Sequence, residues 1–248
     1  MCATPDTIAM LGKFITHCED SLTASVLTHL LHLPMEVCWR VIQQACYTTE
    51  LPDTVGEPSE VELWPKWNSD STGNAYYVEP DVFLRFRDFD LIIEAKRWDD
   101  GQQDKAQWRR EVIAYANEYR HEGRPLRMIA LGGIHHEHDD HLTVTVPALK
   151  DGSAPAWTLD CPVHMCRWRG VLYQCQRMLR ELKGLKFPTS QTAATCRVLA
   201  DVIDLFAWHS YSTRPWFADA DFRPLALSRQ TPNHHSVLQS ISQRFSAS

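Results

Sequence analysis

The chain has 248 residues, of which 44% are hydrophobic and 23% are charged, and its formal net charge is −6. This is the composition of an ordinary globular protein, and the length suffices for one sizeable domain or for a core with an appended helical part. No apolar run approaches the ~20 residues that a membrane-spanning helix needs, and the first residues lack the basic segment and apolar core of a signal peptide. We therefore expect a cytoplasmic protein that does not enter a membrane and that does not bind nucleic acid strongly through charge alone.

The first part of the chain predicts helices followed by a loop. Apolar residues recur at helical spacing over residues 6–33, are interrupted by Pro34, and continue over residues 35–47. Glycine, proline and polar residues then predict, in chain order, a loop, a short strand and a turn, at residues 51–59, 61–64 and 68–74.

The middle of the chain predicts a sheet with one helix between its strands. Residues 76–86 and 89–98 are rich in aromatic and β-branched residues, which is typical of neighbouring strands. A long helix is expected from Gly101 to about residue 121, and further strands are expected at residues 126–131 and 142–146.

The expected domain boundary is the loop at residues 147–156, which contains a glycine and two prolines. We place a first domain at residues 1–150, with the sheet and the N-terminal helices, and a second at residues 151–248, packed on it. The second domain is expected to contain two helices and an irregular tail, at residues 163–182, 191–211 and from 213 onward.

Acidic residues stand beside both of the middle strands. Pro80-Asp81 lies at the end of one apolar run, and Glu94-Ala95-Lys96 lies at the end of the next. If these runs are adjacent strands, Asp81 and Glu94 can converge on one divalent cation. Period-two alternation then places Lys96 on the same face as Glu94. The other interpretation is a chance surface pair, but an unpaired carboxylate at the end of a buried strand would be costly.

These residues resemble the PD-(D/E)XK nuclease superfamily, whose signature is Pro-Asp, a variable gap and Asp/Glu-X-Lys. The resemblance covers roughly residues 35 to 135. The expected order of helix, three strands, helix and strand matches the αβββαβ core of that superfamily. The resemblance thus implies a restriction endonuclease-like α/β fold, with a mixed central sheet flanked by helices, followed here by C-terminal helices.

The resemblance also implies a metal site. Asp81, Glu94 and the Ala95 carbonyl would hold Mg²⁺, for which Mn²⁺ can substitute. Lys96 would stay charged between two anions and orient the attacking water or the phosphate. A glutamine on the following helix contacts DNA or orients the lysine in many relatives, and Gln107 resembles it. The alternative for Gln107 is an ordinary place on the surface of its helix.

Other acids near the motif are weaker candidates. Glu79 points to the opposite face from Pro80, and Asp88 and Asp90 are assigned to the turn between the two strands. Gln107 begins a helical face that Glu111 and Tyr115 continue at four-residue intervals. Some relatives place a further acid on the helix before the sheet, and the choice between Glu36 and Glu50 for this role stays open.

Two other groups of metal-binding residue types do not predict a site. The run of histidines and acids at residues 135–141 lies between two strands and is expected to be a solvated loop, and His234-His235 in the tail is a weaker candidate still. Cys161, His164 and Cys166 would make half of a zinc site, but no second pair follows at suitable spacing. The eight cysteines include no Cys-X-X-Cys pair, so we expect reduced and mostly buried thiols.

The expected activity is that of a metal-dependent DNA endonuclease or nickase, with duplex DNA favoured over RNA. The chain carries no helicase motif, phosphate-binding loop or DNA-reading module. We therefore expect a protein partner or a homo-oligomer to supply target recognition, and the resemblance implies the nuclease subunit of a bacterial defence or mobile-element system. Two alternatives stay open: a catalytically inactive scaffold or nucleic-acid-binding subunit, and a nuclease that acts on RNA.

Overall fold

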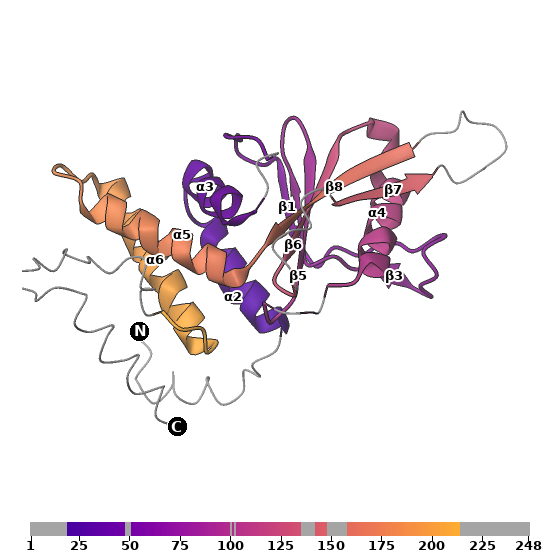
Figure 1. The fold of residues 1–248 in the computed structure, drawn as a ribbon. Coiled ribbons are helices and arrows are strands. Elements are labelled where there is room, and N and C mark those ends of the chain that lie inside the picture. The colour runs from indigo at the N-terminus through magenta and orange to yellow at the C-terminus, as the bar shows by residue number, and fades with distance from the viewer. Residues whose placement is uncertain are drawn as a thin grey trace, which may run out of the picture. The chain divides into compact units, whose positions relative to one another are not determined.

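The computed structural model describes residues 19–47, 51–99, 101, 103–134, 142–147 and 158–213. Within them, a six-stranded sheet lies between a group of four helices and a single helix (Figure 1). Its strands in spatial order are β1 (Glu60–Leu63), β4 (Val82–Arg85), β5 (Asp90–Ala95), β6 (Leu126–Leu131), β8 (Thr158–Cys166) and β7 (Leu142–Pro147). The sheet is mixed, because β5, β6 and β8 run parallel while the other neighbouring pairs are antiparallel.

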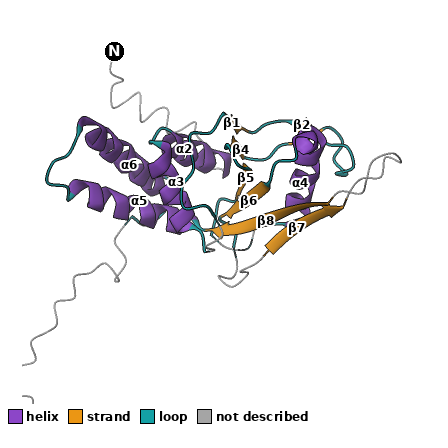
Figure 2. Cartoon of the chain, turned by 90° about the horizontal axis from the view of Figure 1, so that it is seen from above, coloured by secondary structure: helices purple, strands orange, loops and turns teal. Residues whose placement is uncertain are grey.

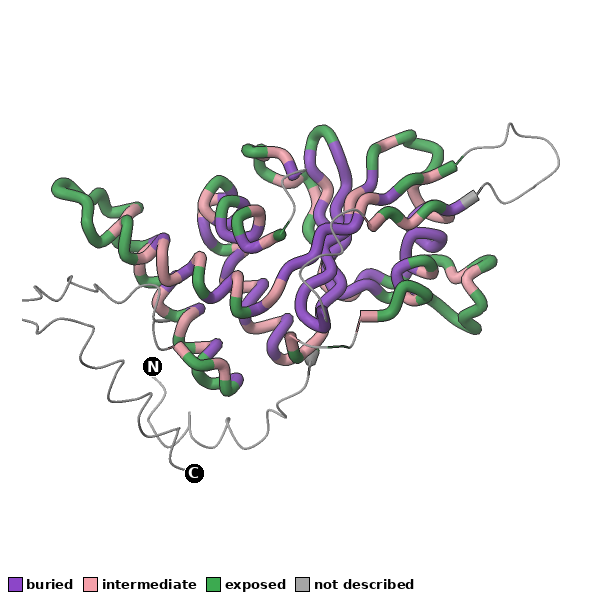
Figure 3. Tube along the Cα trace, in the orientation of Figure 1, coloured by how far each residue is buried: buried purple, intermediate pink, exposed green. Residues whose placement is uncertain are grey.

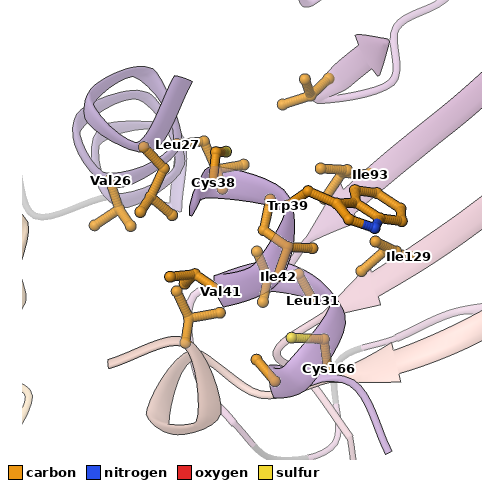
Figure 4. Close-up of a cluster of buried hydrophobic side chains, with 14 of the residues drawn as sticks. Val26, Leu27, Cys38, Trp39, Val41, Ile42, Ile93, Ile129, Leu131 and Cys166 are labelled. Atoms are coloured by element: carbon orange, nitrogen blue, oxygen red, sulfur yellow. The ribbon is translucent and has the colours of Figure 1, made fainter. Parts of the chain in front are cut away.

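Four helices cover one face of this sheet: α2 (Glu19–Leu31), α3 (Met35–Ala45), α5 (Trp168–Lys183) and α6 (Ser190–Trp208). They lie together on one side of the strands (Figure 2). Trp39 and Ile42 of α3 pack in one apolar cluster with Ile93 of β5 and with Ile129 and Leu131 of β6 (Figure 4). The central strands are accordingly the most deeply buried part of the sheet (Figure 3).

The helix α4 (Lys105–Tyr119) covers the other face and continues into a short 3₁₀ turn at Arg120–Glu122. It starts at Asp104, whose side chain accepts a hydrogen bond from the Ala106 amide, as a helix N-cap should. Ile92 of β5 faces this helix, while Ile93 faces the four-helix group. Period-two alternation therefore aims the next side chain, that of Glu94, toward α4.

The last turn of α4 holds a small hairpin formed by β2 (Trp67–Asn68) and β3 (Tyr77–Val78). Asn117 Nδ2 donates to the Asn68 carbonyl at 3.0 Å, and a Glu118 carboxylate oxygen accepts from the Asn68 amide at 2.8 Å. Trp67 packs edge-on against Phe83 of β4 and Tyr115 of α4. The hairpin is thus attached to the helix and to the sheet together.

The architecture confirms the predicted α/β class and the mixed sheet flanked by helices. It corrects the helix that we predicted over residues 163–182. Residues up to Cys166 belong to β8, and α5 begins only at Trp168. The sheet thus continues beyond residue 150, where we placed the domain boundary, because β8 lies between β6 and β7. The periodicity of α5 is strong enough to obscure the shorter strand before it.

The cysteines follow the sequence-based expectation where the structure describes them. All six in the described part of the chain are free thiols, and four of these are buried. Burial raises the pKa of the Cys38 thiol to about 12, which keeps it protonated. Cys161 and Cys166 lie in apolar clusters on opposite faces of the sheet, so they do not form a half-site with His164. The histidine runs at residues 135–141 and 234–235 lie outside the described residues.

None of the helices in the described part of the chain has the length and apolarity that crossing a bilayer requires.

Asp90 is the first residue of β5 and is fully buried, which corrects its assignment to the turn. Its carboxylate accepts from Tyr115 Oη at 2.8 Å and pairs with Arg124 Nε at 3.0 Å and Arg85 Nη2 at 3.3 Å. Side chains from β4, from α4 and from the segment after the 3₁₀ turn thereby meet at one buried anion. Asp88 alone keeps the predicted role, as an exposed residue between β4 and β5.

We expect Asp90→Asn to lower the free energy of unfolding by about 3–5 kcal/mol, because it leaves two half-buried guanidinium groups without their anion. Denaturant unfolding followed by circular dichroism measures this. The matched control is Asp88→Asn, an exposed acid two residues away, which should change stability by less than ~0.5 kcal/mol. Equal effects of the two substitutions would contradict a structural role for the Asp90 cluster.

Candidate active site

The register of β4 and β5 brings the two motif acids together. Val82 pairs with Ile93 in the antiparallel ladder, so the next position outward places Asp81 beside Glu94. Both side chains lie on the α4 face of the sheet, and they are 7% and 2% exposed. Asp81 and Glu94 therefore meet at one point, as the spacing predicts.

Asp81 is held by hydrogen bonds to both of its carboxylate oxygens. The Ala95 amide donates to Oδ2 at 2.7 Å, and the Trp64 indole donates to Oδ1 at 3.2 Å. The first bond crosses from one motif strand to the other, so it fixes the carboxylate relative to Glu94. Ala95, which we named for its carbonyl, thus also contributes its amide to the site.

Glu94 carries two donors on one oxygen. Lys96 Nζ lies 2.5 Å from Oε1, and Gln107 Nε2 lies 2.6 Å from the same atom. Lys96 reaches it because residues two apart share a face of a strand, and Gln107 reaches it from the first turns of α4. The structure therefore brings together Asp81, Glu94, Ala95, Lys96 and Gln107.

A third carboxylate, that of Glu111, lies in the same place. Glu111 stands one helical turn after Gln107 on α4 and is 1% exposed. Neither of its oxygens has a hydrogen-bond partner of acceptable geometry among the described residues. Burial raises the pKa of Glu111 well above its usual range, the carboxylates of Glu94 and Asp81 raise it further, and the nearby Gln107 amide offsets this only in part. A buried acid in this state holds a proton or requires a cation.

The backbone around Lys96 is closely packed. Gly132 and Gly133 follow β6 with φ of 72° and 63°, a conformation that favours glycine. A Cβ on Gly132 would lie 2.3 Å from the Lys96 carbonyl oxygen, and one on Gly133 would lie 2.9 Å from Lys96 Cβ. The same Lys96 carbonyl accepts the Trp168 indole N–H at 2.7 Å. The glycines therefore let β6 and α5 approach the lysine closely enough to fix its backbone.

Gln103 connects these parts of the site. Its Nε2 lies 3.1 Å from the Glu94 carbonyl and 3.2 Å from the Gly132 carbonyl, while its Oε1 accepts from the Trp108 indole at 2.7 Å. It thus joins the ends of β5 and β6 to the start of α4, beneath the acidic side chains.

Sequence reasoning did not single out Glu111, Gln103 or Trp64 for the site. Glu111 lies four residues after Gln107, so the sequence shows that the two share a helical face. It does not show which part of the sheet that face contacts. Tyr115 on that face instead binds Asp90. Glu36 is exposed on α3, in the opposite helical layer, Glu79 is exposed before Pro80, and Glu50 lies outside the described residues.

The three carboxylates do not have the mutual arrangement of ligands around a metal ion. Across the residues that the structure describes, no group of three or more His, Cys, Asp or Glu side chains is arranged to hold a metal ion. Asp81 and Glu94 instead face donors from Ala95, Trp64, Lys96 and Gln107. The donor set of three carboxylates nevertheless suits a hard divalent cation, since Mg²⁺ and Mn²⁺ prefer oxygen ligands.

The raised pKa of Glu111 gives the protein a pH dependence with a defined sign. Because the folded state holds this proton more tightly than the unfolded state, stability is fully present below the usual pKa of glutamate and falls as pH rises toward the folded pKa. Glu111→Gln should therefore stabilise the metal-free protein by about 1–3 kcal/mol at neutral pH and flatten this dependence.

Thermal unfolding across a pH series, with and without Mg²⁺, tests this prediction. Mg²⁺ should raise the Tm of the wild-type protein more than that of Glu111→Gln. The control is Glu36→Gln, an exposed acid in the other layer, for which both curves should follow the wild type. A destabilised Glu111→Gln variant at neutral pH would show that the carboxylate is already well accommodated without a cation.

Comparison with known proteins assigns the chain to no family. No protein-family model matches it, and neither does any curated protein or any solved structure. The chemistry that can be attributed to the chain therefore comes from the arrangement of its own residues.

Proposed function

We propose that this protein is a metal-dependent endonuclease or nickase that hydrolyses phosphodiester bonds in DNA. One observation carries the proposal: Asp81 and Glu94 lie side by side, next to Lys96 and to a buried Glu111 whose oxygens make no hydrogen bond of acceptable geometry with the described residues. Three carboxylates and an ammonium group in one buried place are costly unless a cation and an anionic substrate complete them.

Asp81, Glu94 and Glu111, with the Ala95 carbonyl, would hold Mg²⁺, and Mn²⁺ would substitute for it. When bound, this ion supplies charge neutralisation at the phosphate and lowers the pKa of a coordinated water. Glu111 would release its proton on forming the site, because a nearby cation favours the charged form of a carboxyl group. The affinity for metal should therefore rise with pH.

Lys96 would provide the positive charge on the substrate side. Its ammonium group donates to Glu94, and through its charge it would orient a water or a phosphate oxygen. Gln107 donates to the same oxygen of Glu94 and would keep the carboxylate turned toward the cation. The placement of Lys96 by Gly132 and Trp168 limits the motion of its backbone.

The second candidate is a catalytically inactive scaffold or nucleic-acid-binding subunit. It is favoured by the closed state of the acids, since Asp81 and Glu94 already accept protein donors and the described residues contain no formed metal shell. In that case Lys96 would be a permanent partner of Glu94, and the site would serve the stability of the sheet. The nuclease proposal, in contrast, includes target recognition by a protein partner or a second copy of the chain, and a place in a bacterial defence or mobile-element system.

Cleavage of plasmid DNA, linear duplex, single-stranded DNA and RNA, each with Mg²⁺, with Mn²⁺ and with a chelator, tests the activity. Asp81→Asn and Lys96→Ala should each lower the rate by about 100-fold or more, because they remove a metal ligand and the charge on the substrate side. The exposed acid variant Asp88→Asn should keep the wild-type rate. The scaffold would be favoured if the wild-type protein and the variants fold and bind nucleic acid alike and none of them, the wild type included, cleaves in the presence of metal.

Gln107→Ala should weaken activity or metal affinity by about 10- to 100-fold, which is typical of a residue that orients a metal ligand. The loss should be larger at low Mg²⁺ and diminish at saturating metal, which distinguishes orientation of Glu94 from damage to the fold. Gln191→Ala, at an exposed position in the first turn of α6, is the control. A loss that does not depend on metal concentration would place Gln107 outside the metal site.

A further inference from the structure

A cavity of about 470 Å³ lies at the same edge of the sheet as the candidate active site. The parallel strands β5, β6 and β8 all end at this edge, and the segments that follow them form the cavity wall. A last portion of the wall comes from the end of α6. The cavity is lined by Trp98, Asp99, Ile134, Arg167 and Arg169, among others.

The wall is cationic, although the chain as a whole has a net charge of −6. Arg167 donates from Nη2 to the Ile134 carbonyl at 3.3 Å, which fixes its guanidinium at the cavity. The side chain of Arg169 is 81% exposed, and its Nε lies 3.8 Å from Asp99. Arg97, next along the chain from Lys96, does not line the cavity, but its guanidinium lies over the ring of Trp98, which does.

The one acid in the wall, Asp99, is already used by the fold. Its oxygens accept from the Trp168 amide at 2.8 Å and the Arg169 amide at 3.2 Å, so its charge faces the first turn of α5. The positive charge of Arg167 and Arg169 thus exceeds the single negative charge, and the cavity favours an anion.

An exposed tryptophan borders this cationic wall. Trp98 is 44% exposed, whereas four other tryptophans, Trp39, Trp67, Trp108 and Trp168, are exposed by 3% or less. The guanidinium of Arg97 lies 4.8 Å from the centre of the Trp98 ring, which holds the ring in place through a cation–π contact. An aromatic side chain beside arginines is the combination on which unpaired nucleobases stack.

The cavity lies close to Lys96 in the chain and in space. Trp98 lies two residues after Lys96, a stretch of chain that spans at most about 7 Å. Trp168, between the two arginines in sequence, donates its indole N–H to the Lys96 carbonyl. A nucleotide strand that places one phosphate at Lys96 would therefore carry its neighbouring nucleotides to this cavity.

We propose that this cavity is a nucleotide subsite, in which Arg167 and Arg169 hold a backbone phosphate of DNA and Trp98 stacks the adjacent unpaired base. The inference rests on the proposed nuclease function, and it specifies the substrate: DNA with a single-stranded segment next to the bond that is cut. A base inside a duplex cannot stack on a protein ring unless it leaves the helix, so the subsite favours overhangs, gaps or flaps over blunt duplex.

The test measures binding separately from cleavage. Fluorescently labelled DNA, either single-stranded or blunt duplex, is titrated with the full-length protein in Ca²⁺, and anisotropy is recorded over a series of salt concentrations. Trp98→Ala should weaken single-strand binding about tenfold and leave duplex binding unchanged, since one stacked base is lost. Arg169→Gln should weaken both and reduce the salt dependence by about one phosphate contact.

Two control variants remove the same types of side chain, an aromatic ring and an arginine, at positions away from the cavity. Phe187→Ala removes an aromatic side chain that is 90% exposed in the turn between α5 and α6, and Arg177→Gln removes a positive charge two turns further along α5. Both should bind like the wild type. Parallel melting curves identify any variant that has lost its fold.

The outcomes separate the two proposals. If Trp98→Ala and Arg169→Gln bind both DNAs like the wild type, the subsite is disproved, and Asp81-dependent cleavage would still support a nuclease. If the two variants lose single-strand binding while the wild type cleaves nothing, the subsite stands and the catalytic proposal fails. A tenfold loss on duplex DNA for Trp98→Ala would overturn the assignment of the ring to an unpaired base.

Discussion

The hydrogen bond from the Ala95 amide to the Asp81 carboxylate is the interaction on which the site depends. It joins the first residue before β4 to the last residue of β5, and it forms only in the register that pairs Val82 with Ile93. A slip of one residue would turn Glu94 and Lys96 toward the four-helix layer and bury them among apolar side chains. The apolar faces of both strands therefore specify the positions of the acids.

The two faces of the sheet differ in the polarity of the side chains that they bury. The face toward α2, α3, α5 and α6 is lined by aliphatic and aromatic side chains, which belong to the larger of the two apolar clusters. The opposite face has apolar residues near the middle of the strands and carboxylates where β5 ends. A single helix, α4, covers that face. The free-energy cost of burying Glu94 and Glu111 therefore acts against the packing of this one helix on the sheet. The extensive apolar layer offsets that cost.

The sequence was sufficient to predict the α/β class, a strand beside each motif and the meeting of Asp81 with Glu94, because these follow from period-two alternation and the ends of apolar runs. The single strand predicted over residues 76–86 is wrong, since β3 ends at Val78 and β4 begins at Val82 in another sheet. It was not sufficient for β8, whose residues precede a strongly amphipathic helix. Asp90 illustrates another limit, since a polar residue near a turn can be either exposed or fully buried. The choice depends on Arg85, Tyr115 and Arg124, which come from distant parts of the chain.

Glu111 could not be assigned from sequence for a related reason. Helical periodicity shows which residues point in the same direction. What they contact depends on how the helix is rotated and placed on the sheet. Gln107 and Tyr115 stand on the same face of α4, yet one binds Glu94 and the other binds Asp90, at opposite ends of β5. The length of the helix matches that of the strand, so each turn meets a different residue of β5.

The attachment of the β2–β3 hairpin to Asn117 and Glu118 has a mechanical consequence. Glu111 and these two residues belong to the same rigid rod, and Tyr115 anchors that rod between them. An ion that drew Glu111 toward Asp81 would tilt the rod about this anchor and pass the displacement to the outlying hairpin. If such an ion binds, occupancy of the buried acids and the position of the hairpin would be coupled through α4, without any ligand touching the hairpin.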